Sequence, residues 1–141
     1  LYRSSEEAGI PDYCKAHDMT FFAYMVLEQG ALSGKYDTKH PLPAGSQRAE
    51  TYNPLLPKLE QLTAAMKQIG ERHGASVPQV AIAWAIAKGT TPIIGVTKPA
   101  QVEDAAKAAT LALTAEEVAQ LERLAADSGV DTRDSWEALM V

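Results

Sequence analysis

Residues 91–105 constrain the fold of this chain more than any other stretch. They read TPIIGVTKPAQVEDA, which predicts a short buried strand, a turn at Gly95 and the first turns of a helix. Unpaired backbone N–H groups and the positive end of the helix dipole meet at such a turn, so it can hold an anion. A strand–turn–helix unit with one glycine is also plain architecture in many α/β proteins. Both interpretations therefore stay open at this point.

The side chains of this turn suit a phosphate. Gly95 has no Cβ, so a ligand can approach the backbone closely. Thr97 offers a hydroxyl group and Lys98 a positive charge. Pro99 fits the first turn of a helix, where its missing N–H costs nothing.

A second glycine-containing loop follows an earlier apolar run. Residues 19–27, MTFFAYMVL, are almost wholly apolar and rich in aromatics, which predicts a strand buried on both faces, as in a parallel sheet. Glu28, Gln29 and Gly30 end the run, and residues 30–36 form a loop with two glycines and Lys35. Residues 37–53 hold two prolines and a glycine, and they predict a long irregular surface loop.

The rest of the chain predicts helices. Residues 10–17 form a short helix, and two capping boxes, residues 76–79 and 114–117, each open another. The helix over residues 80–88 is apolar nearly all round, and the tail from residue 131, with Trp136, is expected to pack back. Three further helices should turn apolar stripes inward: Leu55, Leu59, Leu62, Met66 and Ile69; Val102, Ala105, Ala106 and Ala109; Val118, Leu121 and Leu124.

Strands that alternate with helices indicate an α/β fold with a parallel sheet. Two strands do not make a sheet that stands alone, so further strands must come from elsewhere in a longer polypeptide or from another copy. We therefore expect self-association through exposed strand edges. The start, which has neither an initiator Met nor a signal-peptide pattern, also predicts a piece of a longer polypeptide.

Composition excludes several function classes. The net charge is -5 and the pI about 5.1, which argues against a nucleic-acid partner. No apolar run has the length of a membrane span, so no membrane partner is expected. The single Cys14 indicates a reducing compartment, and we expect a cytoplasmic location. No metal-binding pattern and no catalytic residue can be assigned.

Several motifs in order resemble the aldo-keto reductase family. Residues 22–36, FAYMVLEQGALSGKY, are similar to its seventh strand and the following loop. Residues 81–104 are similar to the segment through its eighth strand, and residues 113–118 and 129–136 to its closing helix and tail. The resemblance implies a (β/α)8 barrel, of which residues 1–141 would be a single partial domain, the C-terminal part of an incomplete barrel.

The resemblance also implies a site for NADP(H), with NAD(H) possible because Gln101 replaces an Arg of some branches. In such barrels the loops after strands seven and eight commonly hold phosphate. The first loop would hold the pyrophosphate through Met25, Leu27, Glu28, Gln29, Gly30 and Lys35, with Arg48 as a further clamp. The second would hold the adenosine half through Gly95, Thr97, Lys98, Gln101 and Asp104, with Thr97 and Lys98 nearest any 2′-phosphate.

The same resemblance implies a fragment of an oxidoreductase that reduces aldehydes and ketones. The family's catalytic Asp, Tyr, Lys and His lie on earlier strands, so the carbonyl substrate belongs to a full-length parent. Met25-Val26-Leu27 stands where the family has Ser-Pro-Leu, which removes one hydroxyl group. The alternative is a catalytically inactive half-barrel that binds a nucleotide or associates with itself.

Overall fold

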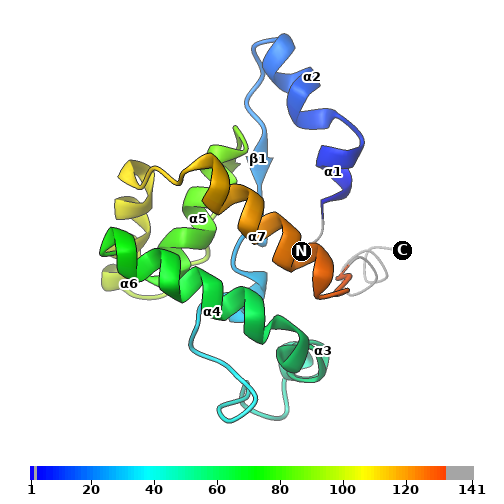
Figure 1. Cartoon of the computed structure of the whole chain (residues 1–141), viewed down its shortest axis with the longest axis vertical. Helices are drawn as coiled ribbons and strands as arrows, with labels where there is room; N and C mark the ends of the chain where they lie inside the picture. The colour runs from blue at the N-terminus through cyan, green and yellow to red at the C-terminus, as the bar shows by residue number, and fades with distance from the viewer. Residues whose placement is uncertain (2, 133–141) are drawn as a thin grey trace.

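The computed structural model describes residue 1 and residues 3–132. Helices pack against one face of a two-stranded parallel sheet, and the α1–α2 pair extends to one end of the molecule (Figure 1). The elements are, in order, α1 (Ser4–Glu7), α2 (Ile10–Ala16), β1 (Phe22–Ala23), η1 (Glu28–Gly30), α3 (Gln47–Tyr52), η2 (Asn53–Leu55), α4 (Leu56–His73), α5 (Val77–Ala87), β2 (Thr91–Pro92), α6 (Pro99–Lys107), η3 (Ala108–Thr110) and α7 (Ala115–Asp127).

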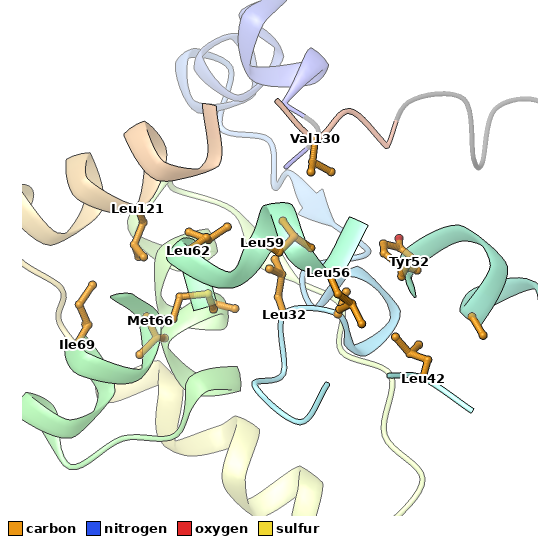
Figure 2. Close-up of a cluster of buried hydrophobic side chains, with 14 residues drawn as sticks. Leu32, Leu42, Tyr52, Leu56, Leu59, Leu62, Met66, Ile69, Leu121 and Val130 are labelled. Atoms are coloured by element: carbon orange, nitrogen blue, oxygen red, sulfur yellow. The ribbon is translucent and has the colours of Figure 1, made fainter. Parts of the chain in front are cut away.

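The core lies between helices. Figure 2 shows Leu59, Leu62 and Met66 of α4 at its centre, with Leu121 reaching them from α7 and Leu32 from the loop after β1. Helix α4 also contacts α5, which is covered on most sides as its apolar sequence predicts. The predicted stripe is confirmed except at its start. Leu56 is buried there, whereas Leu55 is only half-buried.

Both predicted capping boxes are confirmed. The Ser76 hydroxyl accepts from the Gln79 amide while the Gln79 side chain accepts from the Ser76 amide, and Thr114 and Glu117 repeat the arrangement. Arg72 donates to Glu117 at 3.0 Å, and His73 lies 2.9 Å from the same carboxylate, so Glu117 joins the end of α4 to the start of α7. Burial opposes ionisation of Glu117. The Thr114 amide, His73 and Arg72 together nevertheless hold its pKa below the usual range.

The sheet pairs β1 with β2 in parallel, as expected. Phe22 is in register with Thr91, and Ala23 with Pro92. The amides of Thr91 and Ile93 donate to the carbonyls of Phe21 and Ala23 at 2.8 and 2.7 Å. Neighbouring residues of a strand point their N–H groups to opposite edges. The missing N–H of Pro92 therefore falls on the edge of β2 that faces away from β1, and it does not disturb the pairing of the two strands.

The prediction of a long strand buried on both faces was wrong. Strand β1 covers only two residues, and the backbone leaves the extended region at Met25. Phe22 is 58% exposed and Tyr24 62% exposed, and Ile93 after β2 is 56% exposed. One face of the sheet packs on the helices. The other face is more than half exposed at these three residues. The prediction failed because burial depends on neighbouring elements, which the run itself does not encode.

Two further expectations are corrected. The loop over residues 37–53 contains helix α3, which Ser46 begins by accepting from the Ala49 amide. In α6 the inward face was misjudged: Val102 is 52% exposed, and Ala106 and Ala109 are exposed, whereas Ala108 is fully buried and Ala105 half-buried. The short helix near residue 10 and the stripe of the last helix are as predicted.

None of the helices in the described part of the chain is both long enough and apolar enough to cross a membrane. The expected packing of the tail, including Trp136, concerns residues that mostly lie outside the described range.

Candidate functional site

The loop after β1 has an unusual backbone. Met25, Glu28 and Gln29 have φ angles of 61°, 45° and 50°, and Gly30 has 101°. Residues other than glycine rarely adopt such angles, which cost about 1–3 kcal/mol each and cluster at binding sites. The amides of Glu28 and Gly30 donate to Met25 and Leu27 within the loop, so they are already paired. An anion here must therefore rely mainly on other donors.

Two cations lie beside this loop. Arg48, from α3, donates to the Gln29 carbonyl at 3.2 Å, and its guanidinium carbon lies 6.0 Å from the centre of the Tyr36 ring. The Lys35 ammonium lies 5.2 Å from the same ring centre. A Cβ added at Gly30 would touch Tyr36 at 3.4 Å. The structure thus brings Gln29, Gly30, Lys35 and Arg48 together around Tyr36, with positive charge on a strained loop.

The turn after β2 is open. A Cβ added at Gly95 would meet no atom within 4 Å, so the chain's own packing does not require glycine there. Thr97 and Lys98 are exposed, and Lys98 forms no ion pair with any described residue. The Gln101 side chain folds back so that its oxygen accepts from the amides of Thr97 and Lys98 at 2.8 and 3.0 Å. The donors of this turn are therefore capped by the chain itself.

Asp104 points away from this turn. Its carboxylate accepts from the Ser76 hydroxyl at 2.9 Å and from the side-chain Nε2 of Gln79 at 2.8 Å. The same Nε2 also donates to the backbone carbonyl of Asp104. Asp104 thus anchors α6 to the start of α5. Its expected role toward adenosine stays a prediction.

The Glu28 side chain is also turned inward. It is only 5% exposed and accepts from the Tyr52 hydroxyl at 2.8 Å. Burial raises the pKa of Glu28, against the opposing effects of the Leu1 amino group, Tyr52 and Thr132. The Glu28 carboxylate therefore faces the interior and not the surface of the loop. Met25 and Leu27 are half-buried, and Leu27 packs against the core.

The two loops leave the same edge of the sheet, because β1 and β2 are parallel and in register. Ligands of open and closed parallel sheets bind at this carboxyl edge. No hydrogen bond or ion pair joins the two loops within the described residues. Tyr24, for which sequence reasoning assigned no role, presents an exposed ring at the end of β1, at this edge. Tyr24 directly precedes Met25, whose backbone is left-handed, and the sequence did not predict this conformation.

Comparison with known proteins identifies the class. Residues 1–126 match the sequence model of the Aldo/keto reductase family. The chain belongs to this family, and the resemblance inferred from its motifs is confirmed. The family implies a (β/α)8 barrel, with which the helix-rich chain and its two parallel strands agree.

Three relatives illustrate the match. The chain is 38% identical to the chloroplastic pyridoxal reductase of Arabidopsis thaliana and 34% identical to aldo-keto reductase str7 of Strobilurus tenacellus, with 91% and 79% of this chain covered. It is 26% identical to L-glyceraldehyde 3-phosphate reductase of Escherichia coli strain K12, with 98% covered. The matches span only 34%, 35% and 42% of these relatives, so the chain covers between about a third and two fifths of their length.

Proposed function

We propose that residues 1–141 are a single partial domain, the C-terminal part of an aldo-keto reductase barrel. In this proposal the chain binds the phosphate and adenosine portions of NADP(H), or of NAD(H). The observation that carries the proposal is the parallel pairing of β1 and β2, which sends both glycine-containing loops out of one edge. Lys35 and Arg48 supply positive charge at one loop, and Lys98 supplies it at the other.

The residues present fit such a ligand. Phosphate needs cations that also donate hydrogen bonds, and Lys35, Arg48 and Lys98 are groups of this kind. A close backbone approach needs open space, and the surroundings of Gly95 are open. The exposed Tyr24 ring offers a flat surface on which a heteroaromatic ring can stack. The bound dinucleotide would supply the hydride, while the protein holds it in position.

The complete enzyme, in this proposal, reduces aldehydes and ketones, and this chain alone has no turnover because the groups that polarise the carbonyl belong to other strands. The single Cys14 supports a reducing compartment, which we take to be the cytoplasm. Incubation of the chain with NADPH and a broad panel of aldehydes should leave NADPH absorbance unchanged. Substantial oxidation of NADPH would overturn this assignment of the chemistry.

The substitution Gly95→Ala separates binding from folding. We expect it to leave the unfolding midpoint within the error of wild type, because the new Cβ meets nothing and the φ angle of Gly95 is not in the left-handed region. It should weaken NADPH binding about 3–10-fold, because a methyl group enters the space that a phosphate needs. The measurement is quenching of tryptophan fluorescence on NADPH titration.

The matched control is Gln68→Ala, on the exposed face of α4, which should change neither quantity. Equal NADPH affinity in Gly95→Ala and wild type would count against a ligand at this turn. Absence of any fluorescence response in wild type up to millimolar NADPH would count against the dinucleotide site altogether.

The alternative is a catalytically inactive half-barrel that associates with itself, and one observation favours it. Phe22, Tyr24 and Ile93 are exposed together at the sheet, and the outer edge of β1 has no strand partner in the described part of the chain. Such edges pair readily with other strands. Light scattering should then give a mass above that of one 15.1 kDa chain. Phe22→Lys should shift the material toward monomer, and a monodisperse wild-type monomer would contradict self-association.

A further inference from the structure

A buried carboxyl group is part of the loop after β1. The Glu28 side chain is 5% exposed, and its backbone has a φ angle of 45°, which residues with a Cβ rarely adopt. The carbonyl of the next residue, Gln29, accepts from the Arg48 guanidinium at 3.2 Å. Lys35 follows in the same loop and is exposed. An acidic group is therefore enclosed in a loop that two cations flank.

The carboxyl group of Glu28 has no basic side chain as a partner among the residues that the structure describes. It accepts from the Tyr52 hydroxyl at 2.8 Å and, more weakly, from the Thr132 hydroxyl at 3.5 Å. Its ion pair is with the Leu1 amino group, whose nitrogen lies 3.9 Å from Oε1. Burial of a charge favours the neutral form, and burial accordingly raises the pKa of Glu28. The protonated and ionised forms of Glu28 are therefore closer in free energy at neutral pH than those of a surface glutamate.

The other charged groups nearby are paired with one another. A cavity of about 330 Å³, lined by parts of α1, β1, α4, α5 and α7, also reaches Glu28, and four further charged side chains of the described residues line it. The Lys88 ammonium lies 2.6 and 2.9 Å from the carboxylates of Glu6 and Glu122. The Arg3 guanidinium lies 2.6 and 3.8 Å from the same two carboxylates. These two positive and two negative charges cancel, so the cluster does not compensate an ionised Glu28.

A phosphate at this loop would be repelled by the ionised form of Glu28. The negative charges on the pyrophosphate of a dinucleotide would meet the carboxylate across a buried region, where water screens the repulsion less than at the surface. The protonated carboxyl group is neutral and does not repel the anion. Anion binding and protonation of Glu28 therefore favour each other, and this coupling is reciprocal, as for any two linked binding equilibria.

We propose that the loop after β1 is a proton-coupled anion site, at which a dinucleotide binds together with a proton on Glu28. The affinity for the dinucleotide then falls as the pH rises through the titration of Glu28. The inference rests on the proposed function, because it takes the pyrophosphate to lie at Lys35 and Arg48. Glu28 acts through its charge, so it regulates the affinity of the site and takes no part in the reaction.

The number of protons taken up on binding tests the proposal directly. Wild type and Glu28→Gln are titrated calorimetrically with NAD⁺ and with NADP⁺ between pH 5 and 8, in buffers that differ in ionisation enthalpy. Glutamine keeps the size of the side chain and an acceptor for Tyr52, but it cannot titrate. Wild type should take up more protons than Glu28→Gln, by up to about one per ligand, and its affinity should fall more steeply with pH, by up to about tenfold per pH unit. Uptake by the Leu1 amino group or by the 2′-phosphate of NADP⁺ is common to both proteins and cancels in the comparison.

Tyr52→Phe should shift the same titration without removing it. The substitution keeps the ring and removes the donor that stabilises the ionised carboxylate, so the pKa of Glu28 rises further. The pH range of proton uptake should therefore move upward relative to wild type. A purely structural role of Glu28 would instead change the affinity by the same factor at every pH. Gln68→Ala is the control, and it should match wild type in affinity and in proton uptake.

The outcomes separate this inference from the proposed function. Equal proton uptake by wild type and Glu28→Gln, with both proteins binding a dinucleotide, overturns the inference and leaves the site intact. No binding of either dinucleotide by wild type overturns the proposed function and the inference together. Should Glu28→Gln fail to fold, Tyr52→Phe decides, because an unshifted pH range of proton uptake overturns the inference.

Discussion

Replacing Gly70 by alanine is expected to lower the free energy of unfolding by about 1–3 kcal/mol, the usual cost of overpacking. Helix propensity alone predicts the opposite sign, since alanine is favoured over glycine inside a helix by about 1 kcal/mol. The reason is space. A Cβ on Gly70 would lie 2.5 Å from the carbonyl oxygen of Ala75, and the Ala75 amide donates to the Gly70 carbonyl at 2.8 Å. The connection from α4 to α5 would have to shift.

The measurement is urea unfolding followed by far-UV circular dichroism. Gln68→Ala lies in the same helix on an exposed face, and it should change stability by only a few tenths of a kcal/mol. Equal or greater stability of Gly70→Ala than of wild type would mean that the connection moves without cost. In that case the close packing of α5 on the end of α4 would not depend on glycine.

The helices were predictable because their signals are local. Ser76 with Gln79 and Thr114 with Glu117 satisfy each other within four residues, so the sequence alone specifies the bonds. The stripe of α4 repeats over several turns, which makes its period unmistakable. Helix α3 was missed because it covers only six residues and follows a loop with Pro41, Pro43 and Gly45.

The sheet was predicted less well because burial is a property of neighbours. The residues of β1 are apolar enough for a strand covered on both sides, yet Phe22 is 58% exposed. The register with β2 also depends on contacts across some seventy positions of sequence. The prediction of the inward face of α6 failed for a related reason. The polar Asp104 packs on α5 through hydrogen bonds, which an apolar pattern does not reveal.

At the candidate site the sequence indicated where the two loops lie, but not the hydrogen bonds or the backbone conformation within them. Residue types predicted that the turn at Gly95 can hold a phosphate, and the family resemblance added the loop near Lys35; both roles stay predictions. The residue types could not indicate that Gln101 caps its own turn, because many rotamers of a glutamine are compatible with that position. Nor could they indicate the left-handed backbone at Met25 and Glu28, a conformation that residues with a Cβ rarely adopt.

Replacing Tyr52 by alanine should have the largest effect on stability, a loss of about 3–5 kcal/mol. The Tyr52 side chain is fully buried and fills the space between α3 and the loop after β1, close to Leu42 and Leu56 (Figure 2). Its hydroxyl donates to the Glu28 carboxylate at 2.8 Å. Exposed Tyr13 offers a control, because Tyr13→Ala should cost far less in the same urea titration. Similar losses at the two positions would contradict the assigned packing.

Tyr52→Phe keeps the ring and isolates the hydrogen bond to Glu28. Burial raises the pKa of Glu28, so the folded state keeps a proton that the unfolded chain releases near pH 4.5. The free energy of unfolding therefore falls as the pH rises from 4.5 through the raised pKa of the folded state. Tyr52 stabilises the ionised carboxylate, so its loss raises this pKa further. We expect Tyr52→Phe to lose about 1–3 kcal/mol at pH 7 and clearly less at pH 4, where Glu28 is protonated in both proteins. Tyr13→Phe should be neutral at both pH values, and a loss in Tyr52→Phe that does not depend on pH would show that Glu28 is not the group responsible.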